Sequence, residues 1–308
     1  MPSSHPARTD AHAPQHPPVP PISAKDAPRF GSQARKQALA AAFRSQGEDY
    51  DRLRPGYPPQ VVAAILAQLP GAASAGADAP SGPPSAPVRA VDLGAGTGKL
   101  SWALAAQGVQ VTAVDPSAEM LETARRAGAP RGVDGRDAAA GSPITTRVAS
   151  AETTGLPDGA ADLVTAAQAW HWFDAPAASA EAARLLGGSG VLALVWNMLD
   201  VTIPWVHRLS RIMHAGDIHR EDFVPEVAAP FTLRERSVHS WEDPMPTQDV
   251  IDLARTRSYV ITAEPAQREK VLANLDWYLH EHLGHAPGSI IGLPYRTDLF
   301  LFAPTAGE

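Results

Sequence analysis

The stretch VDLGAGTGKLS, residues 91–101, decides the fold that this chain is expected to adopt. It joins a short apolar run to a helical pattern, and three glycines, Gly94, Gly96 and Gly98, stand at the junction. A turn without side chains lets a ligand approach the backbone, and the free N–H groups that follow attract an anionic group. The stretch therefore predicts a strand, a turn for a nucleotide-type cofactor and a helix.

The glycine spacing separates classes of cofactor. Dinucleotide-binding turns have the pattern GxGxxG, whereas this turn is GxGxG and Lys99 stands close to where the last glycine of that pattern would fall. The spacing disfavours NAD and FAD. An oxidoreductase that depends on either cofactor is therefore the weaker interpretation.

The segments that follow extend the same unit. An apolar run at 109–114 ends at Asp115, about twenty residues after the first glycine, where a carboxylate can accept hydrogen bonds from both ribose hydroxyls. A turn at 150–152, a fourth strand within 156–174 and a fifth strand at 191–197 follow in order. This order predicts an α/β fold.

Five pieces of the chain carry a resemblance to a known family. They are FRSQGEDYDRLRPGYP, DLGAGTGKLS, VTAVDPSAEML, ASAETTGLPDGAADLV and AQAWHWFD. Through them, residues 43–197 resemble a class I S-adenosylmethionine (SAM) methyltransferase of the small-molecule branch that includes trans-aconitate methyltransferase-like proteins. The resemblance implies a Rossmann-like, mostly parallel seven-stranded sheet with an antiparallel last strand, helices on both faces and a helical cap insertion. It also implies SAM as the cofactor.

The resemblance further implies where the cofactor binds. The glycine turn would face the methionine part of SAM, the acid after the second strand would bind the ribose, and the residues after the third strand would flank the adenine. The implied cofactor-binding residues are Asp92, Gly94, Ala95, Gly96, Gly98, Asp115, Pro116, Ala151, Glu152 and Gln168.

Tyr50 and Arg54 precede the fold and lie four residues apart, so a helical segment would place them on one face. In the family, the equivalent helix closes over SAM, and an arginine can pair with the methionine carboxylate in a bidentate manner. We expect both residues to contact the cofactor. The alternative is a solvated arginine and a core tyrosine.

The chain is expected to form one domain, residues 31–308, behind a disordered tail rich in Pro, His, Ala and Ser at 1–30. Within it the expected sixth strand is 234–241 and the seventh is 297–302. Two Gly/Pro-rich insertions are expected at 71–87 and 127–143. The expected core comprises 43–197, 231–247 and 293–304, and the expected cap comprises 198–230 and 248–292.

Composition narrows the function classes. A net charge of -7 disfavours a nucleic-acid partner, because such binding draws on clustered Lys and Arg. No apolar run approaches the roughly 20 residues of a membrane helix. The absence of cysteine excludes disulfides and is compatible with a reducing cytoplasm. We expect a cytoplasmic enzyme with a small-molecule acceptor and no nucleic-acid or membrane partner, and the sequence leaves its oligomeric state open.

Methyl transfer needs positioning more than protein nucleophiles, since the sulfonium methyl group is already activated. His171 follows the fourth strand, where ligands approach a parallel sheet, and is the candidate general base. It can equally be a histidine that bonds the backbone. We expect Trp172, Arg257 and Tyr259 to contact the acceptor, an acidic or aromatic molecule, although surface salt bridges are the commoner role of a single arginine.

His280, His282 and His285 raise the question of a metal site. On a helix only two of them would share a face, and no HExxH pattern is present. We expect no metal site and exposed histidines.

The sequence thus predicts a SAM-dependent methyltransferase that acts on a small organic acceptor, by O-methylation of a carboxylate or hydroxyl group. The alternative is a protein that binds SAM or its product without turnover, as a sensor or partner subunit.

Overall fold

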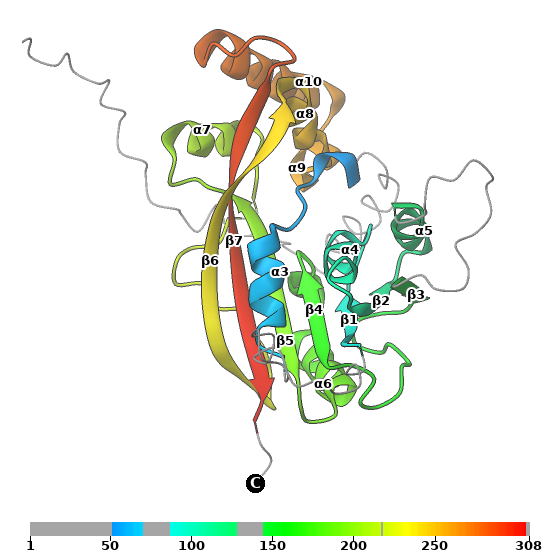
Figure 1. Ribbon diagram of the computed structural model, residues 1–308. Coiled ribbons are helices and arrows are strands. Elements are labelled where there is room, and N and C mark those ends of the chain that lie inside the picture. The colour runs from blue at the N-terminus through cyan, green and yellow to red at the C-terminus, as the bar shows by residue number, and fades with distance from the viewer. Residues whose placement is uncertain (1–50, 70–86, 128–143, 217, 306–308) are drawn as a thin grey trace, which may run out of the picture.

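The computed structural model describes residues 51–69, 87–127, 144–216 and 218–305. At its centre is a seven-stranded sheet of order β3-β2-β1-β4-β5-β7-β6 (Figure 1). The parallel strands are β1 (Arg89–Leu93), β2 (Gln110–Asp115), β3 (Ile144–Val148), β4 (Leu163–Ala167) and β5 (Val191–Leu199). β7 (Ile290–Pro304) is antiparallel between β5 and the edge strand β6 (Phe231–Pro246). The predicted Rossmann-like class is confirmed.

Helices cover both faces of this sheet. Helices α3 (Pro59–Leu66), α4 (Lys99–Ala105) and α5 (Ala118–Ala127) contribute to one buried cluster, and α6 (Ala175–Leu186) contributes to another. Alternate strand residues point to opposite faces, so Leu194 belongs to the α6 cluster and Val195 to the α3–α5 cluster. Strand β5 is buried along its whole length, as a central strand with two covered faces requires.

The last two strands are longer than the sequence predicted. β6 extends beyond the expected 234–241 at both ends, and β7 begins seven residues before the expected Thr297. The two strands pair from Phe231 opposite Pro304 to Pro246 opposite Ile290. Pro244 and Pro246 are tolerated because β6 is the sheet edge, where a missing N–H breaks no ladder on the open side.

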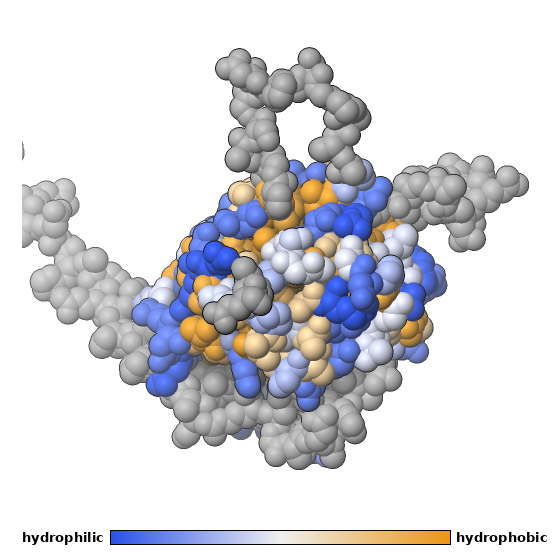
Figure 2. All heavy atoms as spheres, turned by 90° about the horizontal axis from the view of Figure 1, so that it is seen from below, coloured by the Kyte–Doolittle hydropathy of each residue, from blue (hydrophilic) through white to orange (hydrophobic). Residues whose placement is uncertain are grey.

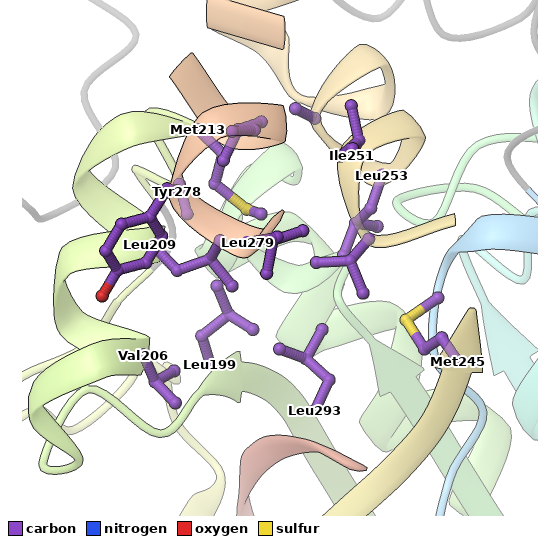
Figure 3. Packing of buried hydrophobic residues seen from close by; sticks show 14 of the residues in the cluster. Leu199, Val206, Leu209, Met213, Met245, Ile251, Leu253, Tyr278, Leu279 and Leu293 are labelled. Carbon is purple, nitrogen blue, oxygen red and sulfur yellow. The ribbon is translucent and has the colours of Figure 1, made fainter. Parts of the chain in front are cut away.

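A group of helices, here called the helical module, lies beyond the carboxyl ends of the parallel strands (Figure 1). The module comprises α7 (Pro204–Ile212), α8 (Thr247–Leu253), the 3-10 turn Ala254–Thr256, α9 (Ser258–Thr262), α10 (Pro265–Trp277) and the π-helical turn Tyr278–His282. Apart from Thr247, the first residue of α8, these elements lie within the segments expected to form the cap. Their apolar side chains, among them Leu209, Leu253 and Leu279, converge on one cluster that also receives Leu199 from β5 and Leu293 from β7 (Figure 3).

On the face of the molecule seen from below, hydrophilic and hydrophobic residues are interspersed (Figure 2). Among the described residues, no helix is long and apolar enough to cross a membrane. The tail at 1–30, Tyr50 and most of the two expected insertions lie outside the described residues.

Candidate cofactor and acceptor site

The glycine turn joins β1 to α4 through three left-handed residues. Gly94, Gly96 and Gly98 have φ angles of 67°, 56° and 80°, a backbone region that residues other than glycine rarely adopt. The backbone N–H of Ala95 donates to Val114 O at 3.0 Å, which fastens the turn to β2. The turn thus has the conformation that its glycines predicted.

The three glycines serve different purposes. A Cβ atom at Gly94 would lie 2.6 Å from Ala169 Cβ, and one at Gly98 would lie 2.9 Å from Ala124 Cβ. At Gly96 a Cβ atom would meet nothing within 4 Å. The outer glycines therefore allow the protein to pack against itself, whereas the middle glycine borders open space in which a ligand can approach the backbone.

Asp92 lies beneath the turn, 1% exposed. Its carboxylate oxygens accept hydrogen bonds from Ser101 Oγ at 2.6 Å and from Thr165 Oγ1 at 2.7 Å. Burial raises the pKa of Asp92 to about 6, because the ionised form loses its hydration. Both hydroxyl bonds connect β1 to its neighbours, so Asp92 braces the turn from below.

Asp115, at the end of β2, borders the same turn. Its Oδ2 accepts the N–H of Gly96 at 3.0 Å, and its Oδ1 accepts the N–H of Ser117 at 2.8 Å across Pro116. The structure therefore places the predicted ribose-binding carboxylate directly beside the middle glycine.

The loop after β3 is fixed by residues that the sequence analysis did not single out. Glu181 on α6 accepts from Thr154 N at 2.8 Å and is paired with Arg184 at 2.7 Å, and Arg184 also donates to Leu156 O at 2.7 Å. These bonds lower the pKa of Glu181 to about 2, and the Arg184 guanidinium is the main cause. The loop contains Ala151, which is 4% exposed, and Glu152, whose carboxylate accepts Asp174 N at 3.0 Å.

His171 and Trp172 belong to a 3-10 turn, Trp170–Trp172, shortly after β4. The indole N–H of Trp196 donates to His171 Nδ1 at 3.4 Å. An indole nitrogen can only donate, so Nδ1 carries no proton and the neutral ring carries its proton on Nε2. The rings of His171 and Trp172 lie 5.3 Å apart.

The segment 51–57, here called the strap, contacts both the helix that follows the glycine turn and the helical module. Arg54 donates to Thr256 Oγ1 at 2.9 Å and to Thr256 O at 2.8 Å, so its side chain binds the helical module. Asp51 lies 3.5 Å from Lys99 Nζ, the first residue of α4, and Arg52 pairs with Asp249 on α8. The strap thereby contacts both the cofactor turn region and the module.

Arg257 and Tyr259, two of the three residues predicted to contact the acceptor, differ in their surroundings. Arg257, just before α9, is 4% exposed. Tyr259 is 37% exposed and stacks on His214 with ring centroids 3.8 Å apart. The structure thus buries the arginine within the module and leaves the tyrosine at its surface.

The histidine prediction was wrong for His280. Its side chain is 12% exposed, its Nδ1 lies 2.9 Å from His285 O, and its Nε2 lies 3.6 Å from Asp276 Oδ1. These groups lie in and next to the π-helical turn Tyr278–His282. His282, in contrast, is exposed and stacks on Trp277. Among the residues with described coordinates, no three His, Cys, Asp or Glu side chains are grouped to hold a metal ion.

Comparisons with known proteins identify the family. Residues 91–194 match the family model described as a methyltransferase domain. An uncharacterized methyltransferase of Mycobacterium tuberculosis is 36% identical over 264 residues, which cover 85% of this chain and 95% of that protein. A second uncharacterized methyltransferase, from Schizosaccharomyces pombe, is 28% identical over 77% of this chain and 87% of its own length.

Solved structures agree with this result. A structure from Anaeromyxobacter dehalogenans, provisionally named a type II methyltransferase, superposes with a TM-score of 0.56 at 25% identity and covers 82% of this chain and 97% of its own. The dinucleotide interpretation, which the glycine spacing disfavoured, finds no support. The chain belongs to the class I SAM-dependent methyltransferases, and SAM is its methyl donor.

Proposed function

We propose that this methyltransferase methylates an oxygen atom, of a carboxylate or hydroxyl group, on a small organic acceptor. The acceptor would lie between the cofactor turn and the helical module. In-line displacement then requires only that the acceptor lone pair be held near the methyl carbon in a water-poor space. A carboxylate acceptor suits such a site especially well, because it arrives already deprotonated and needs no base.

The observation that carries this proposal is a buried arginine in the helical module. Arg257 is 4% exposed and directly follows Thr256, the residue to which Arg54 of the strap donates twice. A guanidinium group matches a carboxylate in planar, bidentate geometry. A buried guanidinium at the module therefore favours an acidic acceptor.

His171 fits the same acceptor as a hydrogen-bond donor. Because Nδ1 accepts from Trp196, Nε2 carries the proton of the neutral ring and is the atom that would donate to an acceptor oxygen. This tautomer favours a donor role over the general-base role that the sequence predicted. Trp172 would line the same space.

We assign cofactor contacts to the glycine turn and to its neighbours. Gly96 and Asp115 carry this assignment, since they border open space and lie within 3.0 Å of each other. Asp92 would act from beneath the turn rather than by contact. The remaining assignments rest on the family resemblance and comprise Tyr50, Arg54, Gly94, Ala95, Gly98, Pro116, Ala151, Glu152 and Gln168.

The test is a panel of carboxylic acids, phenols and amines incubated with SAM, with the release of S-adenosylhomocysteine (SAH) measured. We expect turnover with acids or phenols, and an Arg257→Ala variant should raise KM for an acidic acceptor about tenfold. Arg255→Ala is the matched control, because Arg255 is exposed and pairs with Asp252 at 2.9 Å. Turnover confined to amines, or an unchanged KM in Arg257→Ala, would contradict the proposal. Tight SAH binding without turnover would favour the sensor alternative.

A further inference from the structure

Asn197, at the carboxyl end of β5, is 3% exposed and bonds three segments at once. Its side-chain Nδ2 donates to Gly56 O on the strap at 2.8 Å. Its Oδ1 accepts from Thr297 Oγ1 on β7 at 2.6 Å, and its backbone oxygen accepts from Gln168 Nε2 at 2.5 Å. A buried amide with this many partners is costly to disturb, because each lost bond leaves a buried polar group unpaired.

The orientation of this amide follows from chemistry. Trp241 Nε1, which can only donate, bonds Thr297 Oγ1 at 2.9 Å. Gly56 O can only accept, so the amide must turn Nδ2 toward it, which leaves Oδ1 to accept the hydrogen of Thr297 Oγ1. The chain of bonds begins at a donor-only group and ends at an acceptor-only group, so it has one possible direction.

One end of this series of hydrogen bonds is connected to the glycine turn through the strap. Gly56 lies five residues after Asp51, and Asp51 is 3.5 Å from Lys99 Nζ. Lys99 directly follows Gly98, the last glycine of the turn. The strap between these two anchors is therefore held against the helix that begins at the turn.

The other branch reaches the same turn from the opposite side. Gln168 has a left-handed φ of 55°, which costs of order 1 kcal/mol in a residue other than glycine. Its bonds to Val195 O at 2.8 Å and to Asn197 O hold that conformation. The next residue, Ala169, packs so closely on Gly94 that a Cβ atom there would come within 2.6 Å.

We propose that Asn197 is a positioning residue for the methyl-transfer reaction. Its side-chain amide holds the strap near one end of the glycine turn, and its backbone oxygen holds Gln168, whose neighbour Ala169 packs on the first glycine. This inference uses the SAM cofactor only and does not depend on which acceptor is methylated.

The test is an Asn197→Asp variant, titrated with SAH by calorimetry at pH 8. The substitution keeps the shape but replaces the Nδ2 donor with a carboxylate oxygen facing Gly56 O. We expect about tenfold weaker SAH binding, and hydrogen exchange should show less protection in 51–57, whereas 168–173 should keep its protection because Gln168 bonds the unchanged backbone oxygen. Asn274→Asp, the same change at an exposed position on α10, should leave both measurements unchanged.

The pH profile separates positioning from mere packing. A buried carboxyl group that becomes protonated regains a donor for Gly56 O. The ratio of the SAH dissociation constants, Asn197→Asp over wild type, should therefore fall toward one as the pH is lowered from 8 to 5.5. Taking the ratio removes the titration of Asp92, which both proteins share.

A ratio that stays near one at pH 8, or unchanged protection in 51–57, would overturn the proposal. If Asn197→Asp does not fold, Thr297→Val tests the same chain, because it removes the hydroxyl that orients the amide. Thr297→Val should then weaken SAH binding, and Thr297→Ser, which keeps the hydroxyl, should restore it. Equal SAH affinity in these two variants would likewise contradict the positioning role.

Discussion

The cofactor half of this enzyme and its helical module are built by different means. At the glycine turn, Gly96 bonds Asp115, and the two residues are only 19 positions apart in the sequence. Their spacing can therefore be recognised in a short stretch of sequence. In the module, Leu209, Leu253, Leu279 and Leu293 come from four separate elements and meet only in the folded protein (Figure 3). The cofactor half is thus specified locally, and the module is specified by packing.

This contrast explains why the two regions differ in what they reveal. SAM is the same molecule in every member of the family, so its site needs particular residue types at fixed spacing. An acceptor pocket built between helices needs only the right shape and a few polar groups, which many sequences can supply. Function is therefore easier to assign for the donor than for the acceptor.

The largest expected effect tests whether the module is separable from the cofactor site. Leu279 is fully buried in the module, and Leu279→Ala should lower the free energy of unfolding by about 3 kcal/mol through lost burial and an unfilled cavity. Denaturant unfolding measures this loss, and SAH affinity should stay within about twofold. Leu233→Ala, at a 36% exposed position on β6, is the matched control. If SAH binding weakens in proportion to stability, the two regions do not act separately.

Asp115→Ala should have the next largest effect, confined to the cofactor half. The variant loses the carboxylate assigned to accept hydrogen bonds from both ribose hydroxyls, and two charged bonds of roughly 1.5 kcal/mol each correspond to SAH binding weakened about 100-fold. It also loses the carboxylate that holds Gly96 N and Ser117 N beside the turn. Calorimetry measures the affinity. Asp162→Ala removes an aspartate paired with Arg89 just before β4 and should bind SAH normally. Normal SAH binding by Asp115→Ala would refute the ribose assignment.

The two glycines of the turn should separate stability from binding. Gly94→Ala meets Ala169 at 2.6 Å and should lower the free energy of unfolding by about 2 kcal/mol. Gly96→Ala meets no atom within 4 Å, so it should lose only about 1 kcal/mol from its left-handed backbone while SAH binding falls about tenfold. Thermal unfolding and calorimetry on both variants give the comparison. If the ratio of lost SAH affinity to lost stability is the same in Gly94→Ala and Gly96→Ala, no ligand lies beside Gly96.

The smallest effects are two pH dependences of opposite sign. The raised pKa of Asp92, about 6, means that the folded state takes up its proton first, so its contribution to stability improves as pH falls from about 6 to 4. The lowered pKa of Glu181, about 2, means that its contribution is complete above pH 4.5 and is lost as pH falls toward 2. Denaturant unfolding of Asp92→Asn and Glu181→Gln against wild type should show these opposite slopes. Parallel pH profiles for both variants would contradict the assigned environments.

The sequence predicted the parallel half of the fold well, because its signals are local. The glycine turn and the acid after β2 each depend on a few neighbouring residues. The ends of β6 and β7 were predicted too short, because their length comes from pairing with each other and not from alternation within either strand. The sequence analysis also missed that His280 is largely buried. Its surroundings depend on a π-helical turn and on the backbone oxygen of His285, and no local pattern in the sequence indicates either.

The candidate site divides along the same line. Gly96 and Asp115 could be identified from spacing, but Asn197 is a lone polar residue at the end of an apolar strand, and only its partners on three other segments give it a role. Glu181 is likewise ordinary in sequence, and it acquires its low pKa from Arg184 and the Thr154 loop. A polar group inside a protein is defined by what surrounds it, which spacing along the chain does not encode.

The sequence by itself determined the order of the parallel strands along the chain and, through the family resemblance, the cofactor, because the glycine turn and Asp115 that carry the resemblance lie in short stretches of sequence. Only the tertiary structure decided how Arg54 reaches Thr256, which tautomer His171 adopts and how Asn197 joins the two borders of the turn. These arrangements depend on distances between segments far apart in the chain, and those distances exist only once the hydrophobic clusters have packed.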